Sequence, residues 1–135
     1  MANALYDKGR EKFLKGEIDW LSDDIKIALI DTADYTPNLA SDEFLDDISG
    51  DAIIATSGNL GNKSATNGIA DADDVTFENV TGDQAEILVV YKDTGNASTS
   101  PLIARIDTAT GLPITPNSGD ITVQWDELTN KIFKL

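Results

Sequence analysis

The sequence predicts a mainly β protein: an antiparallel β-sandwich or barrel, jelly-roll-like, with an N-terminal α-helix and one short additional helix. Three observations lead to this fold class. Short apolar runs recur at roughly ten-residue spacing, turn-forming residues separate them, and helical patterns are confined to the first third of the chain. Because 135 residues suffice for one hydrophobic core, we expect a single β-rich domain over residues 1–135, in which residues 1–16 form an N-terminal helical arm.

The chain opens with the pattern of an amphipathic helix over residues 4–15. Asn3 is placed to cap this helix, and Gly16 supplies the positive φ that commonly ends one. The helix carries an apolar stripe made of Leu5, Tyr6, Phe13 and Leu14. Two arrangements are open: the stripe packs on the helix's own domain, or it docks onto a neighbouring subunit.

Shorter elements follow along the chain. Residues 25–31 alternate in the manner of a strand. Ser41 is placed to cap a short helix over residues 42–48, whose inward-facing side chains are Phe44, Leu45 and Ile48. Further short strands are predicted at residues 51–56, 73–80, 120–125 and 130–135.

Residues 84–107 form the stretch around which the other elements are arranged. The run 84–92 carries apolar side chains on both faces at its centre, which predicts a strand buried on both sides. The run 102–107 alternates so that one face is covered and the other mostly exposed. The sequence therefore predicts a β-hairpin whose nine-residue loop, Asp93 to Pro101, is either a plain surface turn or a rim contact.

The composition excludes several classes of function. The chain has no cysteine and no histidine, so disulfides, thiolate or imidazole metal sites, cysteine nucleophiles and histidine-based triads are excluded. Its formal net charge of −14 makes nucleic acid an improbable partner, because an acidic protein repels phosphate. The charge is uneven: residues 1–15 hold four cations against two acids, a net of +2, whereas residues 16–80 hold two cations against fifteen acids, a net of −13.

Membrane insertion and secretion are not expected either. No stretch approaches the roughly 20 apolar residues that are needed to span a bilayer. The N-terminus also lacks the apolar core of a signal peptide. We therefore expect no membrane partner.

Few residues have the pattern of a chemical site. Asp71, Asp73 and Asp74 are the candidate metal ligands, because oxygen ligands at alternate positions can converge on calcium. The glycine and the distal glutamate of an EF-hand loop are missing, so a solvated turn is favoured and no metal site is predicted. We expect no catalytic residue, no cofactor and no enzyme. With 24 acids in the chain, a hydrolase that uses two carboxylates is kept only as a minor alternative.

Two long stretches carry a family resemblance: MANALYDKGREKFLKGEIDWLSDDIKIALIDTADY (residues 1–35), and residues 80–125 together with the ending KIFKL. They resemble small virion structural proteins of tailed bacteriophages, of the capsid decoration or cement type. The resemblance implies a protein that is made in the host bacterial cytoplasm and built into the virion at the capsid surface. It further implies a homotrimer on the major capsid protein lattice, and it brings no catalytic or ligand-binding residue.

A capsid decoration protein holds neighbouring subunits together through buried area and edge pairing, and it needs no reactive site. For that role the expected contact elements are the N-terminal helix and Trp20, with Tyr6 and Phe13 as the interface candidates of the helix. The alternative function is a tail or head-fibre-associated module that binds a host-surface glycan. That function requires an exposed aromatic side chain beside a polar groove, and Tyr35 is the one candidate in a predicted loop.

Overall fold

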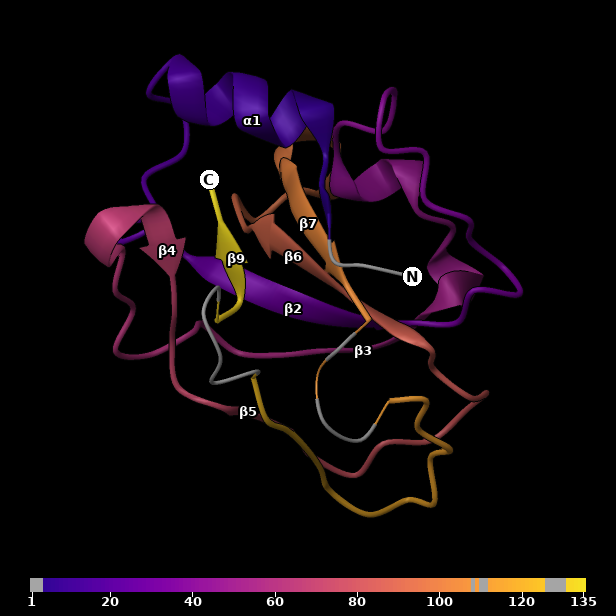
Figure 1. Ribbon diagram of the computed structural model, residues 1–135. Coiled ribbons are helices and arrows are strands. Elements are labelled where there is room, and N and C mark those ends of the chain that lie inside the picture. The colour runs from indigo at the N-terminus through magenta and orange to yellow at the C-terminus, as the bar shows by residue number, and fades with distance from the viewer. Residues whose placement is uncertain (1–3, 108, 110–111, 126–130) are drawn as a thin grey trace.

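The computed structural model describes residues 4–107, 109, 112–125 and 131–135, and these residues form a mainly β fold (Figure 1). A five-stranded antiparallel sheet has the order β1-β7-β6-β2-β3. Its strands are β1 (Ala4–Leu5), β2 (Ile25–Ile30), β3 (Ile53–Thr56), β6 (Ile87–Lys92) and β7 (Leu102–Ile106). The sheet does not close into a barrel among the described residues, so the barrel alternative is wrong for this part of the chain.

Smaller elements surround this sheet. Two further pairs of short strands are β4 (Ile69–Ala70) with β9 (Phe133–Lys134), and β5 (Val75–Phe77) with β8 (Ile121–Val123). One α-helix, α1, spans Asp7–Leu14, and four 3-10 turns lie at Leu45–Asp47, Gly50–Ala52, Thr66–Gly68 and Ala97–Thr99. Each strand predicted outside the hairpin therefore contains an observed strand, shorter than expected, whereas β1 and β4 were not predicted.

The predicted hairpin is confirmed as β6 and β7, which pair antiparallel with Val89 opposite Arg105. All residues of β6 but the last are buried, as expected for a strand covered on both faces. The two faces of the sheet enter different core clusters. Leu88 and Val90 pack with one cluster, and Val89 and Tyr91 with the other.

One part of the hairpin prediction is wrong, because β7 has no exposed face: all five of its residues are buried. The N-terminal segment is the cause, because its strand covers the edge of β7 and its helix packs against β7. β1 pairs with β7 along its edge, and α1 crosses it (Figure 1). Arg105, only 4% exposed, is accommodated there by an ion pair with Asp107, with 3.1 Å between Nη2 and Oδ2.

The helix begins later than predicted. Ala4 and Leu5 are extended, and the backbone amide of Tyr6 donates to the carbonyl of Ile103 at 2.9 Å, so sheet pairing replaces the first helical turn. Tyr6 rather than Asn3 occupies the N-cap position, and no side chain caps the helix there. The predicted stop is confirmed, since Gly16 has a φ of 74°.

The short helix predicted over residues 42–48 is wrong: only one 3-10 turn, Leu45–Asp47, forms there. The carboxylate of Asp47 accepts hydrogen bonds from the amides of Glu43 and Phe44 at 2.7 and 3.0 Å. Phe44 also forms an antiparallel bridge with Pro101. These contacts hold the stretch extended beside the hairpin, so Phe44 and not Ser41 precedes the turn.

The close approach of α1 to the sheet depends on Gly9. A Cβ atom at this position would lie 2.6 Å from the carbonyl oxygen of Leu102 and 3.2 Å from the Cα of Ile103. Both of these atoms belong to the backbone of β7, so they cannot rotate away as a side chain could. Of the two arrangements open from the sequence, the structure therefore has α1 packed on its own chain.

A buried polar chain joins the N-terminal segment to the loop before residue 43. The Tyr35 hydroxyl donates to Asp42 Oδ2 at 2.6 Å, so the Tyr6 hydroxyl, 2.8 Å away, acts as the donor to Tyr35. Burial raises the pKa of Tyr6 to about 12, and burial together with the bond to Asp42 also raises the pKa of Tyr35.

These shifts predict alkaline destabilisation. A tyrosine in the unfolded chain ionises near pH 10, whereas Tyr6 in the folded chain ionises near pH 12. The stabilising contribution of Tyr6 is therefore complete below about pH 10 and is lost as the pH rises toward 12. For Tyr6 the loss by pH 12 is about 2 kcal/mol. We expect the double variant Tyr6→Phe/Tyr35→Phe to lose less stability than the wild type over this window. Urea unfolding at stepped pH measures the difference, and parallel curves for the two proteins would contradict it.

Candidate functional site

A groove lies between the C-terminal end of α1 and the small sheet of β4 and β9, with a volume of about 350 Å³. Three aromatic side chains line it, namely Phe13, Trp20 and Phe133. Small residues on the opposite wall, Ala65 and Gly68, leave the groove open. Its lining is predominantly apolar, and Asp19 is the acidic residue among the lining residues.

The aromatic floor of the groove is held firmly. The rings of Trp20 and Phe133 meet edge to face with centroids 5.3 Å apart, and Phe13 lies 6.3 Å from Phe133. The indole nitrogen of Trp20 donates to the carbonyl of Asp71 at 3.3 Å. Trp20 and Phe133 are 5% and 6% exposed, so little of either ring is open to solvent.

Exposed leucines surround this groove. Among the residues that the structure describes, the large apolar side chains left exposed are Leu14 (88%), Leu21 (56%) and Leu135 (58%). Leu21 and Leu135 line the groove, and Leu14 is the last residue of α1, next in the chain to the lining residue Phe13. Apolar side chains gathered at one place on the surface mark an interaction site more often than isolated ones do.

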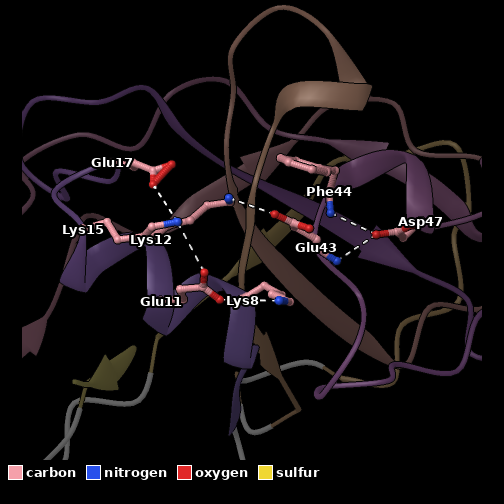
Figure 2. A network of polar contacts seen from close by, with 8 residues as sticks. All are labelled: Lys8, Glu11, Lys12, Lys15, Glu17, Glu43, Phe44 and Asp47. Atoms are coloured by element: carbon pink, nitrogen blue, oxygen red, sulfur yellow. Dashed lines mark hydrogen bonds and ion pairs between the residues drawn. The ribbon is translucent and has the colours of Figure 1, made fainter.

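The charges on α1 are largely paired within the chain (Figure 2). Lys15 Nζ lies 3.3 Å from Glu11 and 3.7 Å from Glu17, and Lys12 Nζ lies 2.9 Å from Glu43. Hydrogen bonding to Glu11 raises the pKa of Lys15, and the same bond lowers the pKa of Glu11. The helix beside the groove therefore presents balanced charges, in contrast to the acidic remainder of the chain.

The candidate calcium ligands do not converge. Asp73 accepts a hydrogen bond from Asn62 Nδ2 at 2.7 Å, Asp74 accepts one from the amide of Trp125 at 3.1 Å, and the Asp71 carboxylate lies 3.6 Å from Lys131 Nζ. Each carboxylate thus has a separate partner.

A different acidic cluster, within the described ranges, brings three carboxylate oxygens within 4.8 Å of one another: Asp31, Asp34 and Asp83. No local pattern predicts this cluster, because Asp83 comes from a turn that is distant in the sequence. The Asp31 carboxylate accepts a hydrogen bond from the amide of Ala33 at 2.9 Å, which is an Asx turn and accounts for this side chain without an ion.

The interface candidates chosen from the sequence have different positions. Phe13 and Trp20 line the groove, whereas Tyr6 is fully buried in the core cluster that contains Tyr35 and bonds to that residue. Tyr35 is 7% exposed, so its ring offers no platform for a sugar. The hairpin loop is exposed over residues 94–99. A 2.6 Å hydrogen bond between the hydroxyls of Thr94 and Thr99 joins the two ends of this exposed stretch.

The chain matches no protein-family model and no curated protein. None of the helices in the described part of the chain has the length and apolar character that crossing a membrane requires.

Proposed function

We propose that this chain is a non-enzymatic virion structural protein of a tailed bacteriophage, a capsid decoration protein that binds the major capsid protein lattice and stabilises the head. The observation that carries the proposal is the apolar groove with its three exposed leucines. An adhesive surface of this kind is what a cement protein needs, because apolar area removed from water supplies most of the binding free energy. The resemblance of residues 1–35 and 80–125 to virion proteins supports the proposal that this surface acts in a phage particle.

The charge of the chain supports the same role. A net charge of −14 keeps a protein soluble at the concentrations of an infected cell and discourages binding to the genome being packaged. By the resemblance, the protein is made in the bacterial cytoplasm and joins the outer capsid surface as a homotrimer. We also propose that the small sheets and the large sheet form a jelly-roll-like sandwich, because Phe77 and Val123 share a core cluster with Leu88.

The glycan-binding alternative, a tail or head-fibre-associated module, has less support. Recognition of a sugar uses an exposed aromatic face beside polar groups. Here two of the three aromatic side chains of the groove, Trp20 and Phe133, are nearly buried, and its lining is apolar. An array of host-surface glycans tests this alternative directly.

The experiment that tests the proposed function is the addition of the purified chain to phage heads assembled without it. We expect binding that saturates at a fixed number of copies per head and raises the temperature at which the heads rupture. Heads that already carry the chain are the control and should take up no more. If the chain fails to sediment with depleted heads even in large excess, the proposed function is wrong.

A further inference from the structure

We infer that the groove beside α1 is a two-fold contact between two copies of this chain, in which Leu14 of each copy enters the groove of the other. This inference goes beyond the proposed function, because it assigns the apolar face to contact between neighbouring copies, the cohesion by which a layer of decoration protein stabilises a head, and it holds whether or not the chain belongs to a phage particle. It rests on the shape of the face, on the position of the exposed leucines and on the distribution of charge.

A projecting side chain lies next to a recess at the end of α1. Leu14 ends α1 and is 88% exposed, while its neighbours Phe13 and Gly16 line the groove. In a two-fold contact, both copies use the same patch. Leu14 of one copy therefore faces the groove of the other copy, and the reverse is also true. Two equivalent contacts then form at once.

The exposed leucines favour contact between like faces over a head-to-tail contact. In the described part of the chain, the large apolar side chains that are exposed are Leu21 and Leu135, which line the groove, and Leu14, which ends the helix beside it. A second copy therefore has no other described apolar side chain of this size with which to fill the groove. Contact between like faces is the arrangement that remains, and it has two-fold symmetry.

The charges favour the same arrangement. Two chains of net charge −14 repel each other over most of their surfaces, but residues 1–15 carry a net of +2 from four cations and two acids. The α1 side of the groove is therefore less repulsive to a second copy than the acidic remainder of the chain. Lys15 follows Leu14 and pairs within its own chain with Glu11 and Glu17, so the charges that flank the inserted leucine are already balanced.

Sedimentation velocity of the full chain and of single variants tests this inference. Leu14→Glu should abolish the contact and halve the mass of the assembly, from dimer to monomer, or from hexamer to trimer if the proposed trimer also forms. The dissociation constant should rise on the order of a hundredfold or more, because two central apolar contacts are replaced by charges. Since Leu14 is 88% exposed in the single chain, the variant should unfold at the midpoint that the wild type shows when it is diluted to the monomer. Thr36→Glu, an exposed site away from the groove, adds the same charge and should leave the mass unchanged.

A mixing experiment separates a specific contact from a general loss of association. Ala65→Lys places a cation in the groove and should also abolish association of that variant with itself. Mixing Leu14→Glu with Ala65→Lys should restore it, because one pair of Leu14 and groove stays intact and the other becomes a pair of Glu and Lys. Wild type that remains monomeric at millimolar concentration, a mass that Leu14→Glu does not reduce, or failure of the mixed variants to associate would each overturn the inference. Dimers that bind no phage head would support this inference and count only against the proposed function.

Discussion

Truncating Trp20 to alanine should lower the free energy of unfolding by about 3 to 5 kcal/mol, the range for large aromatic side chains in protein cores. Trp20 is 5% exposed and packs edge to face on Phe133. Its indole nitrogen also bonds to the carbonyl of Asp71, at the start of the chain segment that follows β4. The substitution therefore removes apolar burial, a ring contact and a hydrogen bond together.

Urea unfolding followed by circular dichroism measures this effect, and two further variants make it specific. Trp20→Phe keeps a ring over Phe133 but loses the N–H donor, so it should cost only about 1 kcal/mol from the hydrogen bond plus a small packing loss. Thr36→Ala, at an exposed site away from the groove, should change stability by less than about 0.5 kcal/mol. A near-neutral Trp20→Ala would show that the ring does not form the floor of the groove.

Replacing Gly9 by alanine should destabilise the protein by about 1 to 3 kcal/mol, the usual cost of overpacking. In an exposed helix the same change stabilises by about 1 kcal/mol, because alanine loses less backbone entropy. Here the new methyl group would lie 2.6 Å from the carbonyl oxygen of Leu102, which is fixed by the hairpin. The helix must lift from β7, and Tyr6, which precedes it, would lose part of its burial.

The unfolding midpoint in urea tests the Gly9 prediction by its sign. Gly58→Ala is the matched control, because no atom lies within 4 Å of a Cβ at that position and its φ is not in the left-handed region. The control should leave the midpoint close to that of the wild type. A higher midpoint for Gly9→Ala would mean that helix propensity dominates and that α1 does not press on β7 as described.

The elements that the sequence predicted well are those whose pattern is local. The β6–β7 hairpin follows from two neighbouring apolar runs, and both runs lie where expected. The start of α1 was missed because sheet pairing with a distant residue competes with the first helical turn. Ala4 pairs with Arg105, and no pattern within residues 1–16 predicts that pairing. The exposed face predicted for β7 was wrong for the same reason, since the segment that covers it comes from the other end of the sequence.

The candidate site shows the same division. Phe13 and Trp20 could be selected from apolar residues near the N-terminus, and both line the groove. Its other wall depends on β4 pairing with β9, two-residue strands too short to leave an alternating pattern. Tyr6 could not be told from Phe13 by spacing alone, because helix position decides which ring is covered and the helix begins three residues later than its pattern suggests.

The pairing of β1 with β7 also bears on how the chain is made. Ala4 leaves the ribosome about a hundred residues before its partner Arg105 is synthesised. During translation the N-terminal segment must therefore wait, with Tyr6 uncovered, until the hairpin has emerged and folded. Contacts between such distant residues form slowly, because a long loop has to close first. The pace of elongation thus limits when β1 docks, and the five-stranded sheet is complete only after β7 has emerged.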